Sequence, residues 1–493
     1  MTIALALSPL LVVGLGALAL MMVEAFSTHL SGFALGAAVI LFAGGAAAGV
    51  VWLFGVEHLS GIESVSPWLI IDDFTLFFDI LLCLGAGIAA LLAGGYLREH
   101  RIDRGEFYAL LLFATVGAMT LVSAGDALTL FLGLETMSIG AYAMTAFRRS
   151  SPRAAEGALK YFLLGSFAAA VLLYGFALIY GATGHTDLMG IGAAAHTAAG
   201  RSPMLVIGVA LVLVGILFEV SAVPFHAWAP DAYEGAPTPT TAFMAVAVKA
   251  AAFAMLLRVL LLAVSDEAWR SWGSGWPPVV AGLAAVTMTV ANLVAGRQES
   301  AKRMLAYSSI AHAGYALVGV TAIGRVPAEA TASVLYYLLG YAVSTAGAFG
   351  TLVLCGSYGR EAVTFEDLAG IGKRNPAVAL AFSLFLLSLA GIPPTAGFFG
   401  KWFVFRAAID GGLYWLALIA LVNSVIAAYY YLRVLVYMYM REPAAGAAVA
   451  RPMRSGYVTA ALLVSAVLVL ALGLTPTHYL DAAVDAASFG PKG

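Results

Sequence analysis

The sequence predicts an all-α, polytopic membrane protein. Of its 493 residues, 62% are hydrophobic and only 11% are charged, and the mean hydropathy is +0.94. Long charge-poor runs recur along the whole chain, and such runs are typical of helices that cross a bilayer. The net charge of −2 and the pI near 6.4 give no indication of nucleic acid as a partner. The partner that this composition indicates is the lipid bilayer.

A count of about 20 apolar residues per crossing gives about fourteen transmembrane helices. The first run, Ile3 to Val23, lacks a basic start, so we expect a retained helix and not a cleaved signal. Cys83 and Cys355 lie in apolar runs without other metal-ligating residues at suitable spacing, and we expect them to be packing residues. The expected spans are 3–23, 31–54, 74–95, 107–124, 126–146, 155–180, 204–225, 237–263, 277–296, 303–323, 329–356, 376–409, 412–440 and 456–474.

The basic residues predict the orientation of these spans. One set of alternate loops holds groups of three: Arg98, Arg101 and Arg104; Arg148, Arg149 and Arg153; Arg297, Lys302 and Arg303; Arg360, Lys373 and Arg374; Arg441, Arg451 and Arg454. The opposite set holds only Arg201, Arg270, Arg325 and Lys492. Because cytoplasmic loops carry the Lys/Arg excess, we expect both termini on the outer side. Three further arginines lie toward helix ends, where their side chains can reach the headgroups: Arg258, Arg406 and Arg433.

Ionisable residues within the expected spans are the candidate functional residues, because a charge at that depth is costly. Glu135 lies about 14 Å into its helix, counted from Asp126 at 1.5 Å per residue. Lys249 lies at a similar depth, next to alanines that permit close helix approach. Lys160 is shallower, only a few residues past Pro152, so its side chain could reach the membrane surface instead.

A proline interrupts the seventh span. Pro224 has no N–H, so the carbonyl of Val220 loses its usual helical partner. A carbonyl of this kind must be buried in protein or line a hydrated cavity. Glu219 and His226 lie on either side of Pro224. A carboxylate and an imidazole beside a hydrated helix break predict a proton relay.

A second break is expected in the run 376–409, which is too long for one straight crossing. Its middle reads LAGIPPTAGFFGKW, in which Pro393 and Pro394 should end the helix before Lys401. Broken helices in the two halves of a chain indicate a binding or conduction site. His312 is a further candidate, about ten residues into its own span. No phosphate-binding loop, cysteine cluster or haem-type histidine pair is present, which indicates ion movement driven from elsewhere.

The antiporter-like membrane subunits of respiratory complex I, the proton-pumping NADH:quinone oxidoreductase, are similar to three stretches of this chain. These are VPFHAWAPDAYEGAPTPTTAF, KRMLAYSSIAHAGY and SLAGIPPTAGFFGKW. The PDAYEGAPTP and ALKYFLLGSF segments most resemble the subunit N members of that family. The resemblance runs from roughly the fourth helix to the thirteenth.

The resemblance implies an architecture and a function. It implies two inverted five-helix repeats, at 107–263 and 277–440, each with a broken helix. Three N-terminal helices at 1–106 precede them, and a fourteenth helix and tail at 441–493 follow. It also implies proton translocation in a bacterial inner membrane, in a complex with other membrane and peripheral subunits. NADH, FMN, iron–sulfur clusters and quinone would belong to those partners, and this chain would hold no cofactor.

The resemblance also assigns residues to the relay, one position at a time. They are Glu135 of the fifth helix, Lys160 of the sixth, Lys249 of the eighth, Lys401 of the twelfth, and His226 and His312 in the shared motifs. One position departs from the family, which usually has a lysine where this chain has Glu219. Two nearby carboxylates do not ionise together easily. We therefore expect Glu135 and Glu219 to share a proton, with Lys160 or Lys249 as the nearest positive charge.

Three alternatives remain on the sequence alone. An Mrp-type cation/proton antiporter subunit would share this fold, as would a hydrogenase-linked pump subunit. A membrane subunit with a purely scaffolding role is the third. The subunits that purify with the chain would distinguish the first two from complex I, and unchanged pumping after loss of Lys249 and Lys401 would indicate the third.

Overall fold

The computed structural model describes residues 3–26, 32–59, 61–197, 202–356, 359–443 and 449–487. Over these residues the chain is helical, and its only β-type pairings are three isolated bridges. Arg201 and Lys492, two of the basic residues used to predict orientation, lie outside the described residues.

The helices follow the order of the expected spans. Their bounds are α1 Ile3–Ala6, α2 Ser8–Phe26, α3 Phe33–Phe54, α4 Asp73–Glu99, α5 Gly105–Ser123, α6 Ala127–Thr145, α7 Pro152–Thr183, α8 Leu188–Ala195, α9 Pro203–Glu219, α10 Trp228–Gly235, α11 Thr238–Phe243, α12 Lys249–Arg258, α13 Pro277–Ala295, α14 Ala301–Ala322, α15 Pro327–Cys355, α16 Phe365–Leu368, α17 Ile371–Arg374, α18 Pro376–Ala390, α19 Ala396–Asp410, α20 Tyr414–Met440, α21 Gly456–Leu474 and α22 Pro476–Ala486. Short 3₁₀ turns are η1 Val56–His58 and η2 Ile62–Val65, and π-helical segments are η4 Met244–Val248 and η5 Val259–Ala263.

Eleven helical stretches in the described part of the chain are long and apolar enough to cross a membrane. Two shorter apolar helices, α9 and α18, occupy the spans in which prolines were expected to interrupt the helix. The prediction of an all-helical membrane protein is therefore confirmed. The helix α22 is a further element that the sequence had suggested only as a tail.

Polar side chains at the helix starts explain many of these boundaries. Asp72, Asp126, Ser151 and Ser300 each accept a hydrogen bond from a backbone N–H in the first turn of the next helix. Such caps satisfy donors that have no partner within the helix. A helix in an apolar environment needs them more than one in water, because water cannot replace the missing partner.

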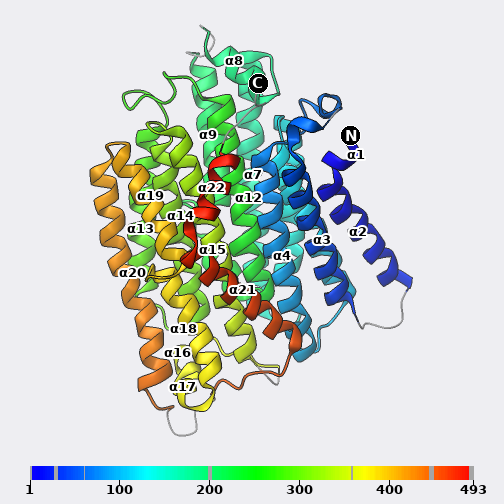
Figure 1. Ribbon diagram of the computed structural model, residues 1–493, viewed down its shortest axis with the longest axis vertical. Helices are drawn as coiled ribbons and strands as arrows, with labels where there is room; N and C mark the ends of the chain where they lie inside the picture. The colour runs from blue at the N-terminus through cyan, green and yellow to red at the C-terminus, as the bar shows by residue number, and fades with distance from the viewer. Residues whose placement is uncertain are drawn as a thin grey trace.

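The long helices run roughly side by side along the longest axis of the molecule (Figure 1). The helices α2 and α3 lie at one edge of the bundle, and α13 and α20 lie at the other. The helix α21 crosses the bundle obliquely and packs against α4, α15, α18 and α19 (Figure 1). The C-terminal segment therefore ties the N-terminal helices to the second half of the chain.

Candidate functional site

The first helix break follows Glu219, the last residue of α9, and α10 starts at Trp228. Ser221 has a φ of 61°, in the left-handed region that non-glycine residues rarely adopt. The N–H of Ala222 donates to the carbonyl of Leu217 at 2.9 Å, and that of Ser221 donates to Phe218 at 2.9 Å. These bonds close the helix end before Pro224 is reached.

The second break has the same backbone pattern. The helix α18 ends at Ala390, Gly391 has a φ of 89°, and α19 starts at Ala396. The N–H of Ile392 donates to the carbonyl of Leu387 at 3.0 Å, as Ala222 does to Leu217. In both breaks a proline lies three residues after the left-handed residue, at Pro224 and Pro394.

Lys401 lies directly against the second break. Its Nζ donates to the carbonyl of Ala390 at 2.9 Å and to Oγ of Ser424, on α20, at 2.9 Å. Pro394 cannot donate to that carbonyl, because its nitrogen carries no hydrogen. The ammonium of Lys401 therefore takes the place of the missing backbone N–H. The ring of Tyr315 lies 4.9 Å from the same Nζ.

Lys249 lies in the centre of the bundle, at the end of the π-helical segment η4. Its side chain is buried, and its Nζ donates to the carbonyl of Ser309 at 2.8 Å and to the hydroxyl of Ser309 at 2.6 Å. The hydroxyl of Tyr341 donates to the same Ser309 Oγ at 2.8 Å. Both lysines are thus held by neutral oxygens.

His312 lies between the two lysines and interacts electrostatically with both. Its Nδ1 is 2.6 Å from the hydroxyl of Tyr337, and its Nε2 is 3.2 Å from the hydroxyl of Tyr431. The Tyr431 hydroxyl also bonds to the hydroxyl of Ser308. Each ring nitrogen therefore has a partner that can donate or accept a proton.

A second polar group lies beside Tyr315, next to Lys401. The amide of Asn292 donates to the Tyr315 hydroxyl at 3.1 Å and accepts from the hydroxyl of Tyr430 at 3.0 Å. Asn423 lies 3.3 Å from the same amide. Buried polar groups in these helices are thus linked to one another, as a low-dielectric interior requires.

Glu219 is buried, with 4% of its surface exposed, and its Oε2 has no hydrogen-bond partner among the described residues. Glu135 is half-buried and close enough for the two charges to interact. Tyr161 packs in the same region, where it stacks on Trp228 at 4.1 Å and contacts Tyr142 at 4.5 Å. The two acids therefore lie in an aromatic environment.

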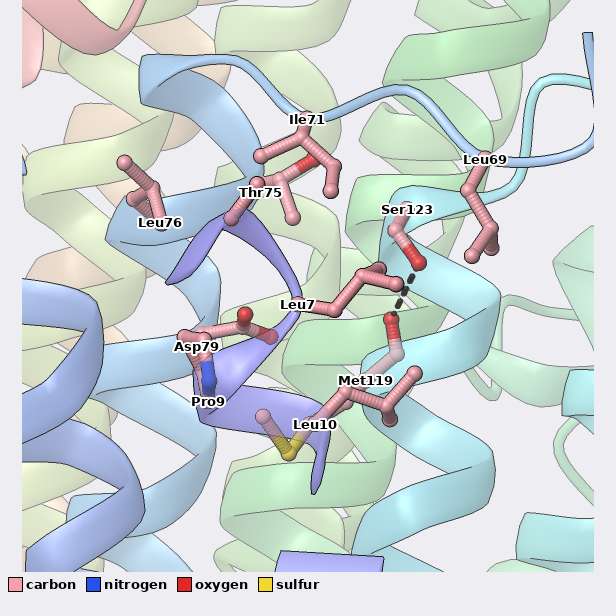
Figure 2. Close-up of a pocket in the computed structure, with 11 residues that line it drawn as sticks. Leu7, Pro9, Leu10, Leu69, Ile71, Thr75, Leu76, Asp79, Met119 and Ser123 are labelled. Carbon is pink, nitrogen blue, oxygen red and sulfur yellow. Dashed lines mark hydrogen bonds between the residues drawn. The ribbon is translucent and has the colours of Figure 1, made fainter. Parts of the chain in front are cut away.

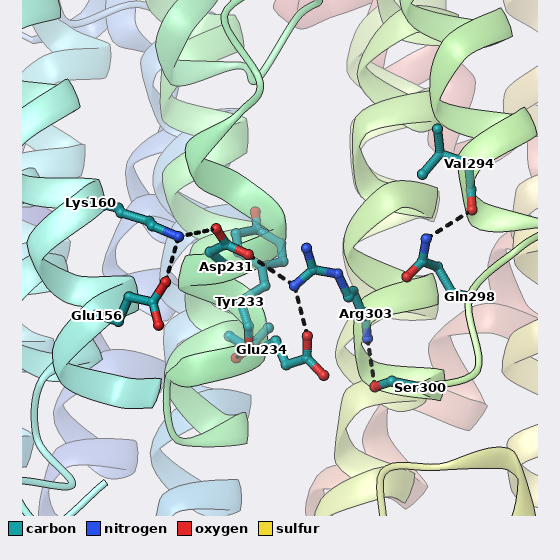
Figure 3. A network of polar contacts seen from close by, with 10 residues as sticks. Glu156, Lys160, Asp231, Tyr233, Glu234, Val294, Gln298, Ser300 and Arg303 are labelled. Carbon is teal, nitrogen blue, oxygen red and sulfur yellow. Dashed lines mark hydrogen bonds and ion pairs between the residues drawn. The ribbon is translucent and has the colours of Figure 1, made fainter. Parts of the chain in front are cut away.

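The two lysines that were expected near these acids bond to other residues. Lys160 is 43% exposed and pairs with Glu156 at 2.6 Å and with Asp231 at 2.7 Å (Figure 3). Lys249 bonds to Ser309, and within the described ranges neither lysine forms an ion pair with Glu135 or Glu219. The expectation that one of these lysines is the nearest positive charge to the acids stays a prediction, because sequence depth does not show which neighbouring helix a side chain faces.

His226 and the prolines at the breaks are all accessible at the surface of this chain. His226 is partly exposed, and no described residue bonds to its Nδ1. Pro224, Pro393 and Pro394 are exposed on this chain. The prolines at both breaks are thus exposed, while Glu219 and Lys401 next to them are buried.

Arg258 does not extend to the headgroups, which corrects the sequence-based expectation. It is 1% exposed and forms a two-pronged ion pair with Asp72, with N–O distances of 2.6 and 2.7 Å. It also donates to Thr75 Oγ1 at 2.7 Å. Asp72 caps α4, so this pair joins α12 to the start of α4.

Asp79 is a buried acid that the sequence analysis missed. It is 5% exposed, and its Oδ1 has no partner among the described residues. It lies on α4 beside a cavity of about 20 Å³, which also contacts Leu7, Thr75 and Ser123 (Figure 2). A cavity of this size has room for one water. The sequence does mark this residue, because Asp79 is a single charged residue within an apolar run.

Comparison with known proteins identifies the family. The family described as NADH:quinone oxidoreductase/Mrp antiporter, TM, matches residues 124–427. The NADH-quinone oxidoreductase subunit N 1 of Sorangium cellulosum is 66% identical over 496 residues, which cover 98% of each chain. The chain belongs to the subunit N family of NADH-quinone oxidoreductase.

Solved structures agree with that assignment. A chain of respiratory complex I from Thermus thermophilus with bound aureothin is 35% identical, with a TM-score of 0.79 over 96% of this chain and 98% of that one. A chain of the Mrp complex from Dietzia sp. DQ12-45-1b has a TM-score of 0.83 over 98% of this chain and 97% of that one. Its identity is only 22%, so it shows the shared fold alone. The predicted resemblance to subunit N is confirmed.

The hydroxyl partners in this subunit N chain were not predictable from the sequence. Ser309, Tyr337, Tyr341 and Tyr431 complete the surroundings of the lysines and of His312. Serine and tyrosine are common in membrane helices, and nothing in their spacing distinguished these four. A charge in an apolar run is visible in a sequence, whereas its neutral partners become visible only in the fold.

Proposed function

We propose that the protein is a proton-translocating membrane subunit of NADH:quinone oxidoreductase, in which redox chemistry in partner subunits drives protons along buried Glu, Lys and His side chains. The observation that supports this most is His312, which interacts with Lys249 and Lys401 and has a hydroxyl on each ring nitrogen. A histidine so placed can accept a proton at one nitrogen and release one from the other.

The chemistry of the two lysines fits the same role. Lys249 and Lys401 donate only to neutral oxygens of serine and backbone groups. An ammonium that is held only by neutral acceptors can give up its proton without leaving a buried carboxylate unpaired. Glu135 and Glu219 form a further pair of proton-holding groups at the first break, and Lys160 and His226 lie toward the surface beside it.

The proposed architecture has fourteen spans, with inverted repeats at 107–263 and 277–440, an N-terminal group at 1–106 and a C-terminal helix and tail at 441–493. The matching backbone bonds at the two breaks support the repeat. The starts of α6 and α14 support it as well. In each case the capping residue forms an isolated bridge with the segment after the next long helix, Asp126 with Asp187 and Ser300 with Thr364.

The chain is proposed to lie in a bacterial inner membrane with both termini on the periplasmic side. Figure 1 supports the alternation, since α17, which contains Lys373 and Arg374, lies at the opposite end of the bundle from α8. NADH, FMN, iron–sulfur clusters and quinone are assigned to partner subunits. The exposed prolines at both breaks support membrane partners that cover the sides of the bundle.

The test is NADH-driven proton uptake by inverted membrane vesicles that contain the whole complex. Lys249→Ala and Lys401→Ala should each lower proton uptake by about tenfold or more, while the complex still assembles. Lys373→Ala is a suitable control, because Lys373 is 70% exposed and pairs only at the surface with Glu442. Full proton yield in both buried variants would contradict the relay and indicate a scaffolding role.

A second candidate is an Mrp-type cation/proton antiporter subunit, since the matching family description includes Mrp antiporters. Affinity purification of the tagged chain from its native membrane distinguishes the two. Flavin- and iron–sulfur-containing partners would support the complex I assignment. Small membrane partners alone would support the antiporter.

A further inference from the structure

Glu361 lies in the segment between α15 and α16 and contacts three helices that are distant in sequence. Its Oε1 accepts from the hydroxyl of Tyr96, at the end of α4, at 2.5 Å, and from Thr238 Oγ1, at the start of α11, at 2.9 Å. Its Oε2 accepts from Lys302 Nζ, on α14, at 3.3 Å. The carboxylate thus joins the ends of α4, α11 and α14.

Lys302 was counted as a loop residue in the sequence, but its side chain is only 1% exposed. Besides Glu361, its Nζ donates to the carbonyl of Ala236 at 2.6 Å. An ammonium in the interior is costly unless it is paired. The carboxylate of Glu361 is the ion partner that the described residues provide.

Lys302 lies on the same helical face as the partner of Lys249. Ser309, which holds the Lys249 ammonium, follows Lys302 by seven residues on α14. Seven residues are two helical turns, or about 10 Å along the axis. The Tyr233 side chain, on α10, also bonds to Ser309. The Glu361–Lys302 pair and the Lys249 ammonium therefore involve residues two turns apart on α14, with hydroxyl groups at the Lys249 end.

A polar cavity of about 280 Å³ is lined by Glu234, Gly235 and Arg303, among other residues. Figure 3 shows Arg303 bridging Asp231 and Glu234 at this place. Gly235 precedes Ala236, whose carbonyl holds Lys302, and Lys302 precedes Arg303. On two separate segments, a residue that lines the cavity is therefore the sequence neighbour of a residue that forms or holds the Glu361–Lys302 pair.

We propose that Glu361 is the residue through which protons are taken up toward Lys249, with its ion pair to Lys302 as the gate between the polar cavity and the interior. The proposal rests on the proposed function, because it needs Lys249 to carry protons. A proton from cavity water binds to Oε2 of Glu361, and the O–H bond that forms ends the ion pair with Lys302. The proton then leaves that oxygen for a hydroxyl or water toward Ser309. Each carrier releases one proton as it receives one, and the last proton bonds to the free amine of Lys249.

The resting state of the gate is the closed one. Burial raises the pKa of Glu361, but Lys302, Tyr96 and Thr238 lower it more, and the pKa lies below its usual range. A carboxyl with a depressed pKa keeps its ion pair at neutral pH and loses it only as the pH falls through the depressed value. The other charged or titratable groups that surround it are His100, which stacks on Tyr96 at 4.1 Å, and Arg148, which donates to the carbonyl of Gly359.

The test compares Glu361→Gln with Glu361→Asp in the whole complex in inverted vesicles. The glutamine keeps an oxygen acceptor for Tyr96 and Thr238 but cannot carry a proton, so NADH-driven proton yield should fall by about tenfold. The aspartate should retain at least about half of the yield and shift its pH dependence. The control Glu366→Gln, at a 58% exposed carboxylate on α16, should leave the yield unchanged.

Equal loss in Glu361→Gln and Glu361→Asp would overturn the proposal, because retaining an ionisable carboxyl at this position would then give no advantage over an uncharged amide. Normal yield in Glu361→Gln together with a loss in Lys249→Ala would overturn it while leaving the proposed function intact. Normal yield in Lys249→Ala would contradict the proposed function itself. If Glu361→Gln fails to assemble, the double variant Glu361→Gln/Lys302→Gln leaves no unpaired ammonium. If this double variant assembles and its proton yield falls by about tenfold or more, the gate is supported. A normal yield overturns it.

Discussion

At the scale of single residues, Lys249 and Lys401 have the same kind of environment. Each ammonium has one backbone carbonyl and one serine hydroxyl as acceptors, from Ser309 for Lys249 and from Ala390 and Ser424 for Lys401. These acceptors are neutral and bind the charged form only moderately. The environment suits a group that must both hold and release a proton.

An arginine should not replace either lysine. Its guanidinium keeps its proton at any physiological pH, and it is larger and planar. Lys249→Arg and Lys401→Arg should therefore lower NADH-driven proton uptake by about tenfold or more, even though the positive charge is kept. Proton uptake by inverted vesicles measures this, with Arg433→Lys as a control for exchange of the same two residue types. Wild-type uptake in either arginine variant would show that only the charge matters at that position.

The carboxylates of Glu135 and Glu219 belong to the same scale. Glu219 has no hydrogen-bond partner for Oε2 among the described residues. Lys160 forms its ion pairs with Glu156 and Asp231, and Lys249 donates to Ser309. Two carboxylates without a positive neighbour ionise together only at high electrostatic cost. We infer that the pair holds one proton at rest, which departs from the acid–base pair that the family resemblance implies.

Infrared difference spectra through a pH titration test this shared proton. A C=O band of a protonated carboxyl is expected near neutral pH, and it should be reduced in Glu135→Gln and in Glu219→Gln. Glu219→Gln should have the milder effect on proton uptake if Glu219 is the neutral partner. Glu366→Gln serves as a control, because Glu366 is 58% exposed and lies near Arg441 at the surface. Absence of the band in the wild-type complex would exclude the shared proton.

The sequence predicted most of the ionisable residues within the helices but not the residues that contact them. Glu135, Lys249, His312 and Lys401 are conspicuous because charge is rare in apolar runs. The environment of Arg258 was mispredicted, because the sequence does not show that Asp72 lies opposite it in the fold. Long-range partners depend on helix packing, and packing depends on the whole set of helix faces.

At the scale of elements, the two helix breaks place functional groups where a continuous helix could not. Each break ends a helix with the same pair of backbone bonds, around Ser221 and Gly391. At the second break the carbonyl of Ala390 remains free for Lys401. Pro394 therefore acts in two ways. It leaves the carbonyl of Ala390 available as an acceptor for Lys401, and it interrupts the helix.

Pro394→Ala tests that role. The alanine introduces an N–H four residues after Ala390, and this donor can compete with Lys401 for the carbonyl. Loss of the hydrogen bond from Lys401 to Ala390 would destabilise the bound ammonium by about 2 kcal/mol. Proton uptake should then fall with little loss of assembly. Pro224→Ala and Pro393→Ala should also lower turnover, by allowing the backbone to straighten.

Pro376→Ala is the matched control for these variants, because Pro376 occupies the first turn of α18, where no helical N–H is needed. Its turnover should equal that of the wild type. Normal turnover in the Pro224, Pro393 and Pro394 variants would mean that the breaks shape the bundle only.

At the scale of the whole molecule, every expected span overlaps a helix, because a bilayer imposes both the length and the apolar composition of a crossing. The oblique course of α21 (Figure 1) was not predictable, nor was the exposure of the prolines at the two breaks. Both depend on how helices pack and on what covers them. Hydropathy along one helix contains no information on either.

The ion pair of Arg258 with Asp72 joins the N-terminal helices to the body of the chain. Arg258 follows Lys249 on α12, and Asp72 caps α4, the last helix of the N-terminal group. Removal of one member leaves the other charge buried and unpaired, which costs about 3–5 kcal/mol. Asp72→Asn should therefore lower the thermal stability of the purified complex and loosen α4 from α12.

Replacement of both members with apolar residues should cost much less, because no unpaired charge remains. The double variant Asp72→Leu/Arg258→Met should regain most of the stability lost in Asp72→Asn, and it should still pump protons, because neither residue contacts Lys249, His312 or Lys401 in the described structure. Thermal unfolding of the purified complex and proton uptake by vesicles measure the two effects. A double variant that is stable but inactive would instead place Arg258 in the proton path. The contact between the N-terminal helices and α12 would then take part in proton transfer.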